Sequence, residues 1–303
     1  MTVPNQTPVD APREIYSGHE SFPFRYGWLP KLYDAVTEDA ALFADDDAAI
    51  ARLGIGKNMV RSLRFWGDAL GLIETDGRLV RLTPFARLLF DPVEGRDRYL
   101  ERTDTLWRLH WRLTTHARLG AWQVAFAELS EPEVTRRHLL ALVRQRAART
   151  RGEFSASTLQ AHVSILLQTY AGMEEGETVV EDTLGCPLQE LRLFRIGNAG
   201  GEPTIKIERG AKAGLGTGAF AEALADHWKR AAPGSQVISL RSLLLDRGGP
   251  GRVFKLDEAA LHERVLTVCR SVVGLEVRED GIGRLDLVAT RRSALRELEQ
   301  VAA

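Results

Sequence analysis

The sequence has 303 residues, of which 44% are hydrophobic and 27% are charged. This composition is typical of a folded protein with a substantial core, and the length allows two domains or several small modules. The 40 Lys and Arg residues nearly cancel the 41 Asp and Glu residues, so any nucleic-acid surface must be a local one.

Motifs for several common chemistries are missing from the sequence. The two cysteines, Cys186 and Cys269, do not have metal-binding spacing, and we expect reduced thiols. No signal-peptide core and no run of about 18 apolar residues is present, which predicts a cytoplasmic protein with no membrane partner. ATP use and acyl hydrolysis are not supported either, because there is no Walker loop, Rossmann fingerprint or G-x-S-x-G elbow.

The N-terminal third predicts a helical module that ends in a hairpin. After a loose tail at 1–14, an aromatic turn leads into a helix within residues 18–36, and three aspartates at 45–47 suit the start of the next helix. Glycines at 54 and 56 mark a tight turn before a helix at 57–70. Asp76-Gly77 then supplies the turn of a hairpin at 72–82.

The rest of the chain shows the same order of predicted elements, helices followed by a hairpin. Residues 98–129 predict helix, and Ser130 with Glu-Pro-Glu at 131–133 predicts the start of another. In the last third, VISLRSLLL from 237 reads as a helix, followed by a further helix, a hairpin and a terminal helix. We therefore expect a mainly α (α+β) fold of several winged helix-turn-helix modules with small hairpin wings. The expected domains are a tail (1–14), an N-terminal winged helix-turn-helix domain (15–97), a helical domain with a second such module (98–200) and a C-terminal one (201–303).

The helix at 57–70 has two opposite faces. A rotation of 100° per residue places Lys57, Arg61 and Arg64 within about 60° of one another. Val60, Leu63 and the other apolar side chains fall on the other side. Such a helix can bury one side and offer three cations to a phosphate backbone.

The surrounding sequence predicts that this helix is the second of a helix-turn-helix, with the hairpin as its wing. Exposed arginine stripes are also common on modules that bind no nucleic acid, and that alternative stays open. The predicted DNA-binding residues are Lys57, Asn58, Arg61, Arg64, Phe65, Arg78 and Arg81. A second basic region either extends a DNA track or is a solvated helix end; it contains Arg136, Arg137, Arg144, Arg146, Arg149 and Arg151.

Two motifs, GHESFPFRYGWLPK from residue 18 and LGIGKNMVRSLRFWG from residue 53, resemble a bacterial family long known only as a domain of unknown function. That family includes SspB of the Ssp-type DNA phosphorothioation defence systems. In those systems a cysteine desulfurase, an ATPase and a sulfur-transfer enzyme cooperate. The resemblance implies a role in replacing oxygen by sulfur in the DNA backbone, and SspB is thought to nick or engage DNA. It supplies no catalytic residues that can be carried over.

The first motif contains candidate catalytic groups. His19, Glu20, Arg25 and Tyr26 lie close together, and a histidine base with an arginine clamp on phosphate would suit DNA nicking. The alternative is that residues 18–28 form a structural turn in which His19 and Glu20 make hydrogen bonds. No metal ligands are identifiable, although a nuclease would use Mg²⁺ or Mn²⁺.

The sequence thus predicts a double-stranded-DNA-binding component of a phosphorothioate modification system, acting in restriction-modification and antiviral defence. In one hypothesis it is a metal-dependent nickase that opens one strand for sulfur incorporation. In another it is a non-catalytic adaptor that links sulfur-transfer and ATPase proteins to DNA. A third hypothesis is a sequence-specific transcriptional repressor.

Overall fold

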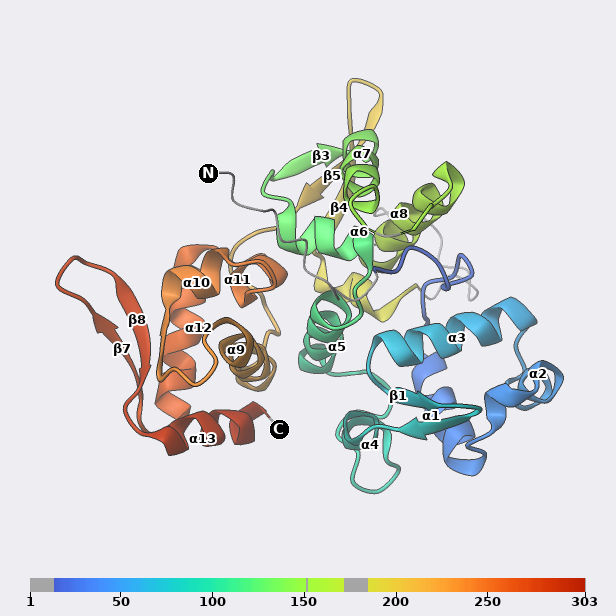
Figure 1. Ribbon diagram of the computed structural model, residues 1–303, viewed down its shortest axis with the longest axis horizontal. Coiled ribbons are helices and arrows are strands. Elements are labelled where there is room, and N and C mark those ends of the chain that lie inside the picture. The colour runs from blue at the N-terminus through green and yellow to red at the C-terminus, as the bar shows by residue number, and fades with distance from the viewer. Residues whose placement is uncertain (1–13, 151, 172–184, 303) are drawn as a thin grey trace, which may run out of the picture.

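The computed structural model describes residues 14–150, 152–171 and 185–302. The elements fall into three units that follow one another along the chain (Figure 1). In that view the N-terminal unit lies at the lower right and the C-terminal unit at the left, with the middle unit between and above them. The predicted tail at 1–14 lies outside the described residues except for Glu14.

The N-terminal unit consists of helices followed by a hairpin, as predicted. Its elements are α1 (Trp28–Glu38), η1 (Leu42–Ala44), α2 (Asp46–Leu53), α3 (Lys57–Ala69), β1 (Ile73–Asp76), β2 (Leu79–Leu82) and α4 (Pro84–Phe90). The expected helix start at 45–47 is confirmed, because the Asp45 side chain accepts hydrogen bonds from the backbone N–H groups of Asp47 and Ala48. Gly54 ends α2 with a left-handed φ of 64°, which glycine adopts without strain.

The middle unit begins with helices and ends in a longer hairpin. Its elements are α5 (Thr103–Thr115), α6 (Gly120–Trp122), the π-helical η2 (Gln123–Glu128), β3 (Glu133–Thr135), α7 (Arg136–Ala147), α8 (Ala156–Tyr170), η4 (Pro187–Leu191), β4 (Phe194–Ala199) and β5 (Glu202–Ile207).

The C-terminal unit follows a similar order and adds a final helix. Its elements are α9 (Thr217–Ala231), β6 (Val237–Ser239), α10 (Leu240–Leu245), α11 (Pro250–Val253), α12 (Glu258–Ser271), β7 (Leu275–Glu279), β8 (Leu285–Ala289) and α13 (Arg292–Ala302).

One topology recurs in all three units. The middle sheet has the antiparallel order β3-β5-β4, and the C-terminal sheet has the order β6-β8-β7. In both, a short strand precedes two or three helices and pairs with the second strand of the hairpin that follows. In the N-terminal unit a single backbone bond from Val80 N to Ala40 O, 2.8 Å, takes the place of the short strand. The α+β class is confirmed, and the winged-helix interpretation of these units stays a prediction.

The two short strands were not predicted. The sequence placed a helix start at 131–133 and a helix over VISLRSLLL from residue 237. The structure instead has strand β3 from residue 133 and strand β6 over the first three residues of VISLRSLLL. The helices begin only after Thr135 and Ser239, whose hydroxyls accept bonds from the N–H groups of His138 and Ser242. Three-residue strands have too little local pattern to be seen in sequence, because their stability comes from pairing with a distant hairpin.

A continuous apolar core joins the units. Trp66 of α3 lies 6.0 Å from Trp122 of α6 between ring centroids, and Trp107 of α5 contacts Phe254 after α11 edge-on at 5.6 Å. Helix α5 also meets α9, where Arg108 forms ion pairs with Glu222. The expected boundaries near residues 97 and 200 stay predictions. Among the described residues no helix has the length and apolarity needed to cross a bilayer.

Candidate nucleic-acid interface

Helix α3 has the two faces that the sequence predicted. Val60, Leu63 and Trp66 are fully buried against the N-terminal unit. On the opposite face about half of the side-chain surface of Lys57 and of Arg61 is exposed. The cations are therefore open to solvent and within reach of a polyanion.

An acidic residue of the preceding helix partly neutralises this face. Asp46 of α2 accepts both Lys57 Nζ and a terminal nitrogen of Arg61 at 3.0 Å, through the same oxygen. Hydrogen bonds to these two cations lower the pKa of the Asp46 carboxyl. Two cations share one anion, so the stripe keeps a net positive charge. The sequence predicts Asp46 as part of a helix start but does not predict these ion pairs, because a pair between helices depends on how the helices cross.

Arg64 lies at the edge of the same stripe and is half-buried. Its guanidinium carbon is 5.6 Å from the centroid of the Phe43 ring, a cation–π distance. Asp68, one turn further along, has its pKa raised by desolvation, and the nearby Arg64 charge opposes that shift. Arg64 is thus less exposed than Arg61.

The other two predicted residues of α3 differ from each other in exposure. Asn58 is exposed at the start of the helix. Phe65 is half-buried, with its ring 6.0 Å from that of His19 and 5.1 Å from that of Trp66. A Cβ atom on Gly18 would lie 2.8 Å from the Phe65 ring, so this side chain packs closely against the first motif.

The hairpin β1–β2 carries the two predicted wing arginines. Gly77 makes the turn with a positive φ of 61°, as the Asp-Gly pair predicted, and Arg78 next to it is exposed. Arg81 is about two-thirds exposed and forms an ion pair of 2.9 Å with Asp76 on the facing strand.

The first motif forms a loop that is fastened to α3. The Phe22 carbonyl accepts hydrogen bonds from Trp66 Nε1 at 2.8 Å and from Ser62 Oγ at 3.2 Å. Glu20 and Ser21 have left-handed φ values of 48° and 61°, which for residues other than glycine are tolerated when contacts around them fix the backbone.

His19 of this loop is buried and paired with a second histidine that sequence analysis did not identify. Its Nε2 lies 3.2 Å from Nδ1 of His162 on α8, and the two rings stack with centroids 5.4 Å apart. Burial lowers the pKa of His19 to about 4 and that of His162 to about 3, so both are neutral near pH 7. Because Ser21 N–H donates to His19 Nδ1, the proton of His19 sits on Nε2 and is donated to His162.

The other three candidate catalytic residues lie around the same loop. Glu20 is exposed and Arg25 is half-buried. The Tyr26 hydroxyl donates to Glu190 of η4, and burial together with this carboxylate raises the pKa of Tyr26. Both ring nitrogens of His19 are engaged within the protein, and Tyr26 holds the loop to the middle unit. A catalytic role for these four residues stays a prediction.

In the second basic region some arginines form ion pairs, of which Arg146 is half-buried and Arg137 is largely exposed. Arg146 forms ion pairs with Glu14 and Glu128, and Arg137 forms one with Glu202 at 3.0 Å. Arg144 and Arg149 are exposed, and Arg151 lies outside the described residues.

Comparison with known proteins identifies the family. The model of a protein family of unknown function, DUF4007, matches residues 16–300. The chain belongs to this family. The resemblance seen in the two sequence motifs is thereby confirmed. No curated protein matches the sequence.

Two solved structures resemble the whole chain. A crystal structure of SspB is 28% identical, and a crystal structure of magnesium-bound SspB is 29% identical. Each match has a TM-score of 0.80 and covers 94% of this chain and 85% of the other.

The residues that the structure describes hold no metal centre built from several protein side chains. Within ranges 14–150, 152–171 and 185–302, no three His, Cys, Asp or Glu side chains are arranged to hold a metal ion together. Mg²⁺ commonly keeps several waters and binds through one or two carboxylates, so a nuclease role with Mg²⁺ stays a prediction.

Proposed function

We propose that this protein binds double-stranded DNA as a component of a phosphorothioate modification system in antiviral defence. The observation that carries the proposal is the exposed cationic face of α3, formed by Lys57 and Arg61 on a helix anchored by Trp66. The similarity to SspB supports the assignment to that system.

The arrangement around α3 supports a winged helix-turn-helix mode of binding. Helix α2 packs on α3, and the exposed hairpin β1–β2 follows directly. In this mode α3 approaches the major groove, and Arg78 and Arg81 on the wing contact phosphates on either side. Asn58 is the exposed residue of α3 that can reach a base edge.

A titration of fluorescently labelled duplex tests the proposal. The wild type is compared with Lys57→Ala/Arg61→Ala and with Arg270→Ala, a control that removes an exposed arginine from α12. We expect the double variant to bind more weakly and with a shallower salt dependence, and the control to match the wild type. Equal binding by all three proteins would remove α3 from the interface.

Strand nicking is a second candidate function, and the magnesium-bound form of SspB favours it. Supercoiled plasmid incubated with the protein and Mg²⁺ or Mn²⁺ would relax to open circle if one strand is cut. Plasmid that stays supercoiled, with DNA binding intact, favours the adaptor hypothesis. In that case the protein should also capture the sulfur-transfer and ATPase proteins on DNA. A repressor would instead prefer one operator over random duplex by several orders of magnitude.

A further inference from the structure

Helix α8 has an unusual exposed face. Its 15 residues include no Asp, Glu, Lys or Arg, although 27% of the chain is charged. Gln160 and Gln168 are exposed and Ser164 is half-exposed, and these three residues recur every fourth position along one side. Exposed helix faces normally carry charges that keep them solvated and form pairs along the helix. A row of uncharged hydrogen-bonding groups needs another explanation.

A hollowed surface lies along this row. Two adjoining hollows of about 560 and 330 Å³ share Arg136, Ser164 and Pro203 in their walls. Gln160 lines the first hollow and Gln168 the second. The row therefore forms the side of a continuous groove between α7, α8 and β5.

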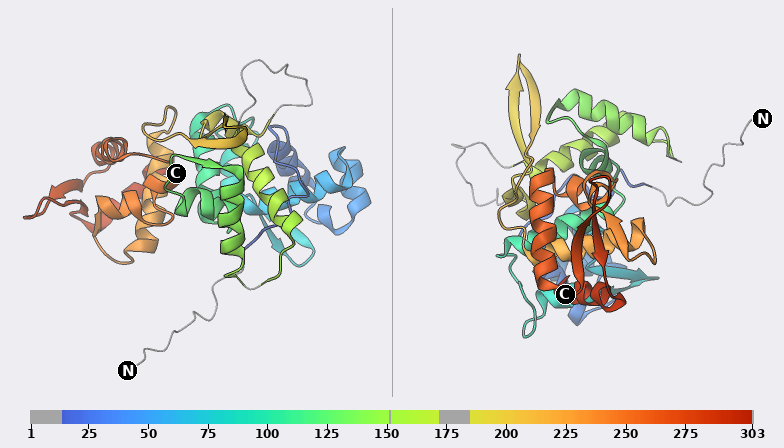
Figure 2. Two further views of the ribbon diagram at one scale, coloured as in Figure 1. Left: turned by 90° about the horizontal axis from the view of Figure 1, so that it is seen from above. Right: turned by 90° about the vertical axis from the view of Figure 1, so that its left-hand side faces the viewer.

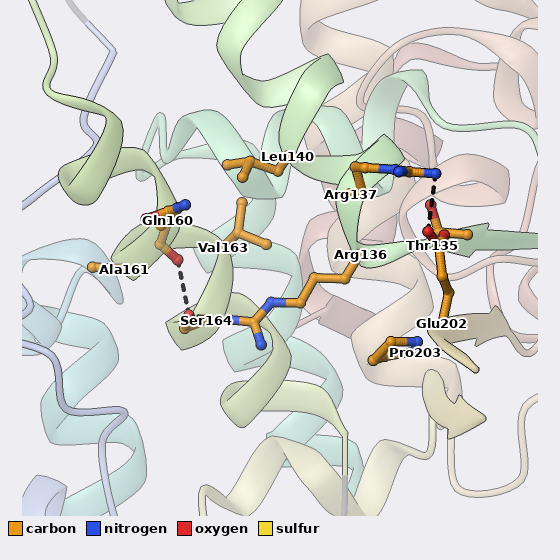
Figure 3. A pocket seen from close by; sticks show the side chains of 10 residues that line it. All are labelled: Thr135, Arg136, Arg137, Leu140, Gln160, Ala161, Val163, Ser164, Glu202 and Pro203. Carbon is orange, nitrogen blue, oxygen red and sulfur yellow. Dashed lines mark hydrogen bonds and ion pairs between the residues drawn. The ribbon is translucent and has the colours of Figure 1, made fainter. Parts of the chain in front are cut away.

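Arginines border this groove on the side of α7. Figure 3 shows Arg136 extending from the start of α7 toward Ser164, whose Oγ accepts its guanidinium at 2.6 Å. Arg137 points instead to Glu202 on the hairpin. Glu202 also lines the groove, and Arg137 neutralises it. The groove thus keeps the single positive charge of Arg136 beside neutral donors and acceptors, which is complementary to a polyanion that also presents hydrogen-bonding edges.

The position of α8 in its unit matches that of α3. Each helix follows a shorter helix and precedes a hairpin whose second strand pairs with the chain before those helices. Helix α12 has the same position in the C-terminal unit, but its exposed residues include Glu258 and Glu263 as well as Arg270, so its face has no excess of positive charge.

The first motif fixes α8 relative to α3. His162 lies about 160° around α8 from Gln160, so it faces inward to His19 while the glutamine row faces outward. The loop that carries His19 is in turn bonded to α3 through the Phe22 carbonyl. The first motif therefore links the two helices directly and fixes how they sit relative to each other.

We propose that α8 reads base edges in the major groove of DNA through Gln160 and Gln168, with Arg136, which Ser164 holds, on the adjoining phosphate. Glutamine pairs with adenine through two hydrogen bonds, and the major groove admits a helix. In this division of labour α3 supplies salt-dependent affinity and α8 supplies sequence preference. The inference rests on the proposed DNA binding.

The experiment selects tight-binding duplexes from a randomised pool and sequences them. The proteins compared are the wild type, Gln160→Ala/Gln168→Ala and the control Gln145→Ala, which removes an exposed glutamine from α7. We expect the wild type and the control to enrich the same sequence. The double variant should lose roughly tenfold or more of its preference for that sequence over a scrambled one. Its salt dependence should stay unchanged, because no cation is removed.

A further variant guards against loss by misfolding. Gln160→Glu has nearly the same shape, but its carboxylate accepts hydrogen bonds without donating any, so the preferred base should change from adenine toward cytosine. Retained preference in the alanine variant would overturn the inference. Equal binding of all duplexes by the wild type would also overturn it and leave the proposed function standing. Absence of duplex binding at 50 mM salt would overturn both.

Discussion

Removing the ion pairs of Asp46 should strengthen DNA binding, whereas removing a salt bridge usually weakens the interaction to which it contributes. Asp46→Asn keeps the shape of the side chain and removes the charge shared by Lys57 and Arg61. Both cations then become free to pair with phosphates, so the variant should bind DNA more tightly than the wild type.

The size of the effect follows from counterion release. Each phosphate contact contributes about 0.9 to the slope of log affinity against log salt concentration. In the wild type Asp46 competes with phosphate for both cations. Its removal therefore steepens the slope by at most about 1.8, the value reached if Asp46 blocks both contacts completely. Between 50 and 200 mM salt, each phosphate contact makes the affinity fall by roughly a further 3.5-fold. Two additional contacts would therefore make the affinity of the variant fall by up to about 12-fold more than that of the wild type across this range.

Fluorescence anisotropy of a labelled random duplex over this salt range measures the slope. Asp47→Asn is the matched control, since it removes the same charge from the same turn of α2. The control should raise affinity only slightly and leave the slope close to that of the wild type. If both variants gain affinity equally, the cause is overall charge rather than release of the two cations, and the reasoning about α3 fails.

Two further predictions concern the junction of the first motif with α8 and the start of α6. Because burial lowers the pKa of His162 to about 3, the unfolded chain binds a proton that the folded chain excludes as pH falls below about 6.5. The free energy of unfolding should therefore fall with acidification. His162→Gln should flatten this pH dependence by about 1.4 kcal/mol per pH unit between pH 6 and 4, as measured by urea unfolding. An unchanged slope would show that the imidazole is not buried as described. Gly120→Ala should lower the free energy of unfolding by about 1–3 kcal/mol, because its Cβ would lie 2.1 Å from the Tyr16 ring, whereas Gly27→Ala, with no atom within 4 Å of the added carbon, should have little effect.

The parts of the fold that repeat within a few residues were predictable from sequence. Helix α3 was expected at 57–70 and spans Lys57–Ala69, because its apolar and basic residues alternate with the helical period. The hairpin followed from Asp76-Gly77 and its flanking β-branched and apolar residues. Both features depend on local chemistry.

The features that sequence analysis missed depend on contacts between distant segments. The ion pairs of Asp46 require α2 to cross α3, and the bond between His19 and His162 joins residues 143 positions apart. The glutamine row of α8 was visible in the sequence, but its exposure was not, because a helix without charges reads equally well as buried.

Chemical protection of arginine tests the central claim most directly. Phenylglyoxal modifies exposed guanidinium groups, and mass spectrometry of the digested protein gives the rate at each residue. With saturating random duplex, the account predicts that Arg61 reacts severalfold more slowly than without DNA, while Arg270 on α12 reacts at the same rate. If DNA is bound and Arg61 still reacts as fast as in the free protein, the cationic face of α3 is not the DNA-binding surface.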